Sequence, residues 1–303
     1  MKINSFTPVS PKLFEGEKRL VYTALFGFLL AAVCGVYAIL HGPVVLPEGN
    51  VQDAFSFNAA VGIFILSVAA FMPLAGFEDK KRLRLRSAFI WTTLLGYGIE
   101  TVQHFRGINP RFTQSSSIID AIANGIFGLV CLMFIIITVI FAAAFFKKNR
   151  SDQRPLLSLA IRHAFISIVL SFAAGAVMIL LQNRFLGPAG NFIILHGIGF
   201  HALQSLPIIA WLLEKSQTNR LTRRNIKLTP KGLIHAGSIA WTAAVIWIAL
   251  QTLLGKTVFE WSLLPLLTFA SLFLWGAALA ASCFMFYRSN WSNPHDRLIS
   301  KIS

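Results

Sequence analysis

Charged residues are scarce in this chain. They make up 13% of its 303 residues, against roughly 25% in a typical soluble domain. Hydrophobic residues make up 55%, including 27 Phe and 7 Trp. No candidate helix keeps the continuous charged face that a helix at a soluble surface needs. The composition therefore excludes an ordinary soluble domain and predicts an integral membrane protein whose surroundings are the lipid bilayer.

Cysteine is nearly as rare, and recognisable catalytic motifs are missing. Cys34, Cys131 and Cys283 lie inside apolar runs, without CxxC or Cys/His spacing, so neither a disulfide framework nor a zinc site is indicated and each is expected to be a small buried apolar residue. The sequence contains no P-loop, HExxH motif or nucleophile elbow. Nucleotide chemistry and hydrolysis of the soluble type are therefore disfavoured.

The net charge of +15 would suggest nucleic-acid binding if the basic residues shared one surface. Here they lie in short segments between apolar runs, and almost only in every second segment. This distribution excludes a nucleic-acid partner.

Apolar runs long enough to cross a bilayer predict an all-α membrane protein. A span needs about 20 mostly apolar residues. The run from 88 is the most polar, and residues 41 to 56 read as a turn-rich loop. Eight runs qualify, at 20–40, 57–77, 88–106, 118–146, 158–183, 191–213, 233–254 and 262–287.

Lysine and arginine predict the orientation of these helices. The N-terminus, the segments 78–87, 147–162 and 214–232, and the tail from 287 together hold 23 of the 27 basic residues. The intervening segments hold the other four, Arg106, Arg111, Arg184 and Lys256. This split predicts a multi-pass protein of the plasma (inner) membrane with both termini in the cytoplasm.

The spans are predicted to form one bundle over residues 1–303, with a possible parallel repeat of four helices in the halves 20–146 and 158–287. Gly35-Val-Tyr-Ala-Ile-Leu40 parallels Gly175-Ala-Val-Met-Ile-Leu180, and Trp91-Thr92 parallels Trp241-Thr242. Because four helices return the chain to its starting side, both halves would have the same topology.

Polar residues gather where the third predicted helix approaches the outer surface. Glu100, Gln103 and His104 are spaced i, i+3 and i+4, which places them on one helical face. By rise per residue, Glu100 lies about 10 Å below the helix end. An ionisable group at that depth usually faces the bundle interior and marks a functional site.

The sixth predicted helix enters the bilayer from the same side. It brings His196, His201 and Gln204, and its polar residues are expected to meet those of the third helix in one site. His104, His196 and His201 are candidate metal or haem ligands, because imidazole binds iron, zinc and copper. The full candidate ligand-binding set is Glu100, Gln103, His104, Arg106, Asp120, His196, His201 and Gln204.

Two stretches resemble an uncharacterised bacterial family of multi-pass membrane proteins. They are Thr101-Val-Gln-His-Phe-Arg-Gly-Ile-Asn-Pro-Arg-Phe112 and Leu195-His-Gly-Ile-Gly-Phe-His-Ala-Leu-Gln-Ser-Leu-Pro207. They are similar to segments of the forms LQ..RG..RF and H..GLHALQ.LP in that family, which implies an eight-helix fold but no activity.

The architecture is also similar to that of haem A synthase, an eight-helix bundle of two four-helix halves in which histidines bind haem. Glu100 and His104 are similar to its glutamate–histidine motif, although their spacing is four and they lie on the third helix. This second resemblance implies a haem site.

Three hypotheses on function remain at this point. The first is a carrier or receptor for a small solute, a lipid or a proton, with Glu100 as its protonatable group. The second is a haem- or metal-binding redox protein. The third is a membrane scaffold or assembly factor, which no feature of the sequence excludes.

Overall fold

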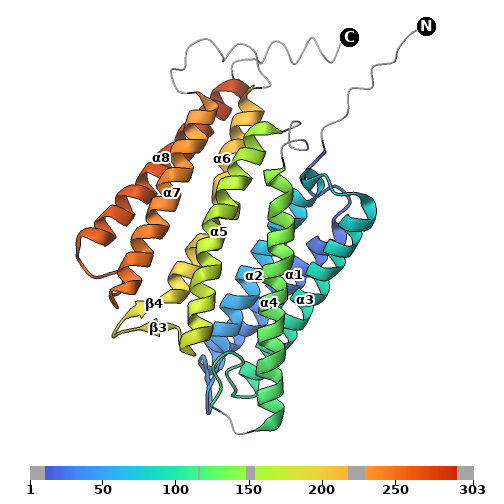
Figure 1. Cartoon of the computed structure of the whole chain (residues 1–303), viewed down its shortest axis with the longest axis vertical. Coiled ribbons are helices and arrows are strands. Elements are labelled where there is room, and N and C mark those ends of the chain that lie inside the picture. The colour runs from blue at the N-terminus through green and yellow to red at the C-terminus, as the bar shows by residue number, and fades with distance from the viewer. Residues whose placement is uncertain (1–10, 115–116, 148–153, 218–228, 292–303) are drawn as a thin grey trace. The chain divides into compact units, whose positions relative to one another are not determined.

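The structure, a computed structural model, describes residues 11–114, 117–147, 154–217 and 229–291. All eight predicted helices are present in these residues (Figure 1). Parts of the predicted basic segments, residues 1–10, 148–153, 218–228 and 292–303, lie outside these ranges. The helices are α1 (Lys18–His41), α2 (Val51–Phe71), α3 (Asp79–Phe105), α4 (Ile118–Phe146), α5 (Pro155–Leu181), α6 (Phe192–Gln217), α7 (Pro230–Leu253) and α8 (Leu263–Trp291).

The chain is an all-α membrane protein. Seven of the described helices are long and apolar enough to cross a bilayer. The eighth, α3, has 27 residues, which corresponds to about 40 Å at 1.5 Å per residue. Its first turns carry five basic residues, and Glu100 and His104 lie near its other end. These polar ends lower the hydropathy of α3 without shortening it.

Contacts divide the chain into two compact units, Met1–Pro155 and Leu156–Ser303. The boundary falls between the two predicted half-repeats. Each unit holds four of the helices and one short hairpin. The units are described separately below, and the prediction of one bundle over residues 1–303 stays a prediction.

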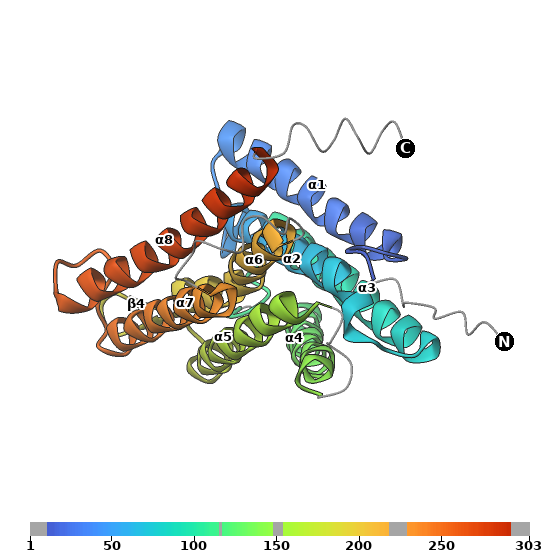
Figure 2. The ribbon, with the colours of Figure 1, turned by 90° about the horizontal axis from the view of Figure 1, so that it is seen from above.

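Aromatic side chains join α2, α3 and α4 in the first unit. The rings of Phe57 and Phe127 are 5.8 Å apart, and those of Phe64 and Phe134 are 5.2 Å apart. Phe89 of α3 also packs on Phe134, at 6.1 Å. In the second unit, α7 and α8 lie side by side (Figure 2). The ring centres of Trp241 on α7 and Trp275 on α8 are 5.1 Å apart in an edge-to-face arrangement.

The predicted loop over residues 41 to 56 is largely structured. Strands β1 (Val44–Val45) and β2 (Gly49–Asn50) form a small antiparallel hairpin. α2 then begins at Val51, six residues before the predicted run, because the Asn50 side chain accepts a hydrogen bond from the backbone N–H of Gln52. Hydropathy alone missed this start because Gln52, Asp53, Ser56 and Asn58 are polar.

The second unit repeats this arrangement. Strands β3 (Phe185–Leu186) and β4 (Gly190–Asn191) pair in the same way, and α6 follows directly. The Asn191 side chain accepts from the N–H of Ile193, as Asn50 accepts from Gln52. Both hairpins contain Pro-x-Gly-Asn, at residues 47–50 and 188–191.

Each hairpin is hydrogen-bonded to the end of the third helix of its unit, and we call this region the hairpin junction. In the first unit, Glu48 N–H donates to the Gly107 carbonyl at 2.8 Å. In the second, Ala189 N–H donates to the Gly255 carbonyl at 3.1 Å. Gly107 and Gly255 have φ angles of 79° and 69°, a conformation that favours glycine. The two junctions thus share the same backbone hydrogen bond and the same glycine conformation.

The junctions define which residues are equivalent in the two units. Gly35 and Gly175 each lie seven residues before a positive-φ residue that ends the first helix, so this predicted pair is in register. Trp91 lies sixteen residues before Gly107, whereas Trp241 lies fourteen before Gly255. The tryptophan pair is therefore two residues out of step. Origin by duplication stays a prediction.

A buried ion cluster closes the opposite end of the first unit, and it was not predicted. Glu17 is fully buried and accepts from Arg82 Nε at 2.6 Å and from Arg86 Nε at 2.7 Å. The cluster ties the start of α1 to the first turns of α3. In the sequence, Arg82 and Arg86 were counted only as part of the basic segment 78–87.

The cysteines differ from one another in their surroundings. Cys34 is buried, as expected, and Cys131 is half-buried. Cys283 on α8 is exposed, so the expectation of a buried residue is wrong there. The apolar outer faces of membrane helices contact lipid, so an uncharged thiol on such a face needs no protein partner.

Candidate functional site

The end of α3 and the loop that follows it form the candidate site. α3 ends at Phe105, and Gly107 turns the chain back toward the helix. The Asn109 side chain then accepts hydrogen bonds from the backbone N–H groups of Arg111 and Phe112, at 2.9 and 3.2 Å. This is an asparagine turn of the usual kind. It places Arg111 beside Glu100, eleven residues earlier in the chain.

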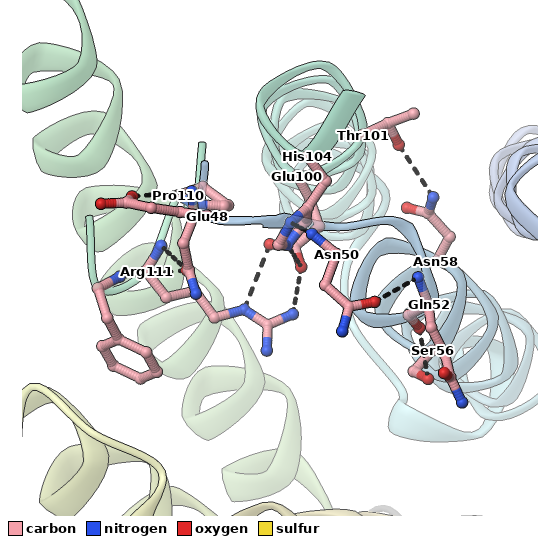
Figure 3. A network of polar contacts seen from close by, with 12 residues as sticks. Glu48, Asn50, Gln52, Ser56, Asn58, Glu100, Thr101, His104, Pro110 and Arg111 are labelled. Carbon is pink, nitrogen blue, oxygen red and sulfur yellow. Dashed lines mark hydrogen bonds and ion pairs between the residues drawn. The ribbon is translucent and has the colours of Figure 1, made fainter. Parts of the chain in front are cut away.

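Glu100 and Arg111 form a two-point ion pair (Figure 3). The Arg111 Nε lies 3.3 Å from one carboxylate oxygen, and Nη2 makes a shorter contact with the other. The Glu100 side chain is fully buried, whereas 22% of the Arg111 side chain is exposed. The guanidinium also lies 5.6 Å from the centre of the Phe57 ring, within the range of a cation–π contact.

Arg111 stays charged in this environment. Burial on its own lowers the pKa of Arg111, but the neighbouring carboxylate of Glu100 more than offsets this and raises the pKa above its usual value. The pair therefore carries one positive and one negative charge next to the bundle core.

His104 completes this centre one helical turn after Glu100. Its Nδ1 accepts a hydrogen bond from the Asn50 N–H at 3.0 Å, so Nδ1 carries no proton and the neutral ring is protonated at Nε2. Nε2 lies 3.3 Å from Glu100 Oε1, without the geometry of a hydrogen bond. The imidazole thus joins the ion pair to the hairpin. We call Glu100, His104 and Arg111 the charged centre.

A second network lies beside the charged centre. The Gln103 side chain donates to Asp120 at 3.2 Å, and Arg106 donates to Asp120 at 3.0 Å and to the Gln103 side-chain oxygen. Five of the predicted site residues are therefore gathered in the first unit: Glu100, Gln103, His104, Arg106 and Asp120.

Glu48 was missed from the sequence although it holds the loop in place. Its carboxylate accepts from the Thr113 hydroxyl at 2.8 Å and from the Gln114 N–H at 2.9 Å. Arg111 was not predicted to contact Glu100, because it follows the third predicted helix and was counted only among the four basic residues of the intervening segments. The Asn109-Pro110 pair marks a turn at this place and was the only sequence signal that could have revealed the contact.

The three predicted site residues of α6 lie in the second unit. His196 packs on Gly175 of α5, and its Nδ1 lies 2.8 Å from the Ser171 carbonyl oxygen. Phe55 packs on Gly35 in the same way in the first unit. His196 therefore occupies a helix-packing position.

His201 and Gln204 form a separate pair on α6. The His201 ring is exposed, and its Nδ1 lies 3.3 Å from the Gln204 side-chain oxygen. At about 100° per residue, His196 and His201 point about 140° apart around the helix. A single binding site beside this helix can therefore include His196 or His201, but not both. Contact between this helix and the charged centre stays a prediction, since the two lie in different units.

The surroundings of His104 decide whether it can hold a metal or haem. Both ring nitrogens of His104 face protein groups, the Asn50 N–H and the Glu100 carboxylate. A metal ligand must present a ring nitrogen lone pair to the ion, so His104 does not fit that role in this arrangement. Within the described ranges, no group of three or more His, Cys, Asp or Glu side chains is placed to hold a metal ion.

One further histidine pair joins two helices of the second unit. His163 Nε2 on α5 lies 3.1 Å from His235 Nδ1 on α7. This contact links α5 to α7 near the ends that carry Arg162 and Lys231.

No family model, curated protein or solved structure matches this chain. The site must therefore be interpreted from its own geometry.

The two junctions differ in charge although they share their backbone. Counting back seven residues from the glycine gives Glu100 in the first unit and Ile248 in the second. By the same count, His104 corresponds to Thr252 and Gln103 to Gln251. The loop after the helix also turns in the same way in both units. The Thr257 side chain accepts a hydrogen bond from the Phe259 N–H, as the Asn109 side chain does from the Arg111 N–H. The charged centre is thus an addition to a junction that also forms without it.

Proposed function

We propose that this multi-pass membrane protein is a carrier or receptor for a small solute, and that the charged centre is its binding site. The observation that carries the proposal is the contrast between the two junctions. The second unit builds the same turn with Ile248 in place of Glu100. A charge buried at bilayer depth is costly, and the fold of the junction does not require it.

The arrangement of the pair supports this proposal. A purely structural buried ion pair is weak evidence for stability, because apolar residues of similar size often serve as well. Glu100 is fully buried whereas part of Arg111 is exposed, so a solute can reach the guanidinium.

Substitution of Glu100 tests the proposal. The purified protein is melted in detergent with a panel of small acids, amines, sugars and lipids. We expect at least one class to raise the melting temperature of the wild type, and Glu100→Gln to abolish that rise. Glu78→Gln is the matched control, because Glu78 is exposed at the other end of α3, and it should behave as wild type. Equal stabilisation of wild type and Glu100→Gln by every active compound would refute the proposal.

We also propose that the protein lies in the plasma membrane with both termini in the cytoplasm, as the 23 to 4 split of basic residues indicates. The hairpin junctions would then face outward. A reporter that is active only outside the cytoplasm should be active when fused near Gly49 or Lys256 and inactive near Lys80. Reporter activity near Lys80 would show that the orientation is the opposite of the one proposed.

A further inference from the structure

We propose that the charged centre binds a solute carboxylate on Arg111 in exchange for the carboxylate of Glu100, which takes up one proton as the solute enters. This inference rests on the proposed function and names the chemical class of its ligand. The observation that supports it is that Arg111, whose side chain is 22% exposed, is already bound at two points by the carboxylate of Glu100.

The contact between the Arg111 guanidinium and the Glu100 carboxylate indicates which chemical group the site recognises. An arginine fork matches the two oxygens of a carboxylate and binds them side by side. Arg111 makes this contact with both oxygens of Glu100. The solute carboxylate therefore needs only to take a place for which the guanidinium is already oriented.

The charge balance of the site requires that Glu100 takes up a proton when the solute anion binds. If a second anion joined Arg111 while Glu100 stayed ionised, the site would hold one uncompensated negative charge at bilayer depth, which is costly. Uptake of one proton by Glu100 leaves Arg111 paired with the solute and Glu100 neutral, so the net charge of the site is unchanged. One acid anion and one proton then enter together, and the step is electroneutral.

No other described titratable group near Arg111 is placed to take up this proton. His104 faces Glu100 from the same helix, and its Nδ1 accepts from the hairpin. The other titratable groups that interact electrostatically with Glu100 or Arg111 are Cys34 of α1, Asp53 of α2 and Cys131 of α4. The thiols are neutral near pH 7, and Asp53 acts on Arg111. Glu100 is the carboxylate in direct contact with Arg111.

The surroundings of Arg111 favour an acid with an apolar body. Phe57 lies under the guanidinium, and its ring contacts Tyr97 and Phe127 at 6.5 and 5.8 Å. An aromatic or alkyl group attached to the carboxylate would lie against these rings. Two sources supply that chemistry, a small water-soluble acid or a fatty acid from the membrane.

Binding of benzoate to the full-length protein in detergent tests the exchange, and benzamide is the neutral match of the same shape. Between pH 8 and pH 6 benzoate stays ionised. Because one proton is taken up with each anion, we expect the affinity for benzoate to rise about tenfold for each unit by which the pH falls, as long as Glu100 is ionised in the free protein. Benzamide should not bind. Dodecanoate in a parallel series identifies the source, since pH-linked binding of dodecanoate alone would assign the site to fatty acids.

Arg111→Lys should weaken binding of the active acid at least about tenfold, because an ammonium cannot make the two-point contact. Arg184→Lys is the control, since Arg184 also lies over a phenylalanine ring near a hairpin, at 5.3 Å, and it should bind as wild type does. Acid binding that does not depend on pH, or equal binding of benzamide, would overturn the exchange. If a neutral solute or an amine binds in a way that depends on Glu100, the exchange is wrong but the proposed function stands. If no compound depends on Glu100, both fail.

Discussion

Replacing Glu100 with leucine should lower the free energy of unfolding by about 3–5 kcal/mol, the usual cost of leaving one partner of a buried ion pair alone. Membrane insertion alone would favour leucine over glutamate. The structure reverses that expectation, because Arg111 would be left beside an apolar side chain and arginine cannot lose its proton. The His104 ring would also lose its acidic neighbour.

A double variant distinguishes the contribution of the Glu100–Arg111 contact from the contributions of each residue's other surroundings. We expect Glu100→Leu with Arg111→Met to recover most of the lost stability, because the two charges leave together and the second unit forms its junction with Ile248 at this place. Unfolding of wild type, both single variants and the double variant in one detergent gives the coupling between the residues. Glu78→Leu should change the stability by no more than about 0.5 kcal/mol, as exposed substitutions usually do. Additive effects of the two single substitutions would show that the contact contributes nothing.

The helices could be predicted from the sequence because a bilayer demands long apolar runs, and that demand is visible residue by residue. The polar end of α3 could be predicted as well. Glu100 and His104 share a face by helical spacing alone, and Gln103 does meet Asp120. These inferences depend on local geometry or on the cost of charge in lipid.

The partner of Glu100 could not be predicted, because it depends on a loop. Arg111 reaches Glu100 only because Gly107 adopts a positive φ and Asn109 turns the chain back. Hydropathy and periodicity carry no information on such turns. The same reason explains why the two hairpins were missed, since each has strands of only two residues and is held mainly by the end of a distant helix.

Glu17 was missed for a different reason. It lies among basic residues just before α1, where a carboxylate normally faces water. Its burial becomes evident only when α3 places Arg82 and Arg86 against it. A charge at a helix end can thus be structural, whereas the charged centre of α3 has a counterpart that is built without charge.

A three-residue exchange tests most directly whether the charged centre serves binding. Glu100→Ile and His104→Thr introduce the residues of the second junction, Ile248 and Thr252. Arg111→Met removes the positive charge with a flexible side chain of similar length, because the equivalent Phe259 is 84% exposed and would not fill the same space. The hydrogen bond from the Asn50 N–H to His104 is lost, at a cost of about 1–3 kcal/mol.

The melting temperature of this variant in detergent should therefore stay within several degrees of that of the wild type, and no solute that stabilises the wild type through Glu100 should stabilise it. A variant that keeps its fold and loses the whole solute response is the result that the account predicts. A variant that keeps the solute response, or that fails to fold even though both charges of the centre are removed together, would contradict it.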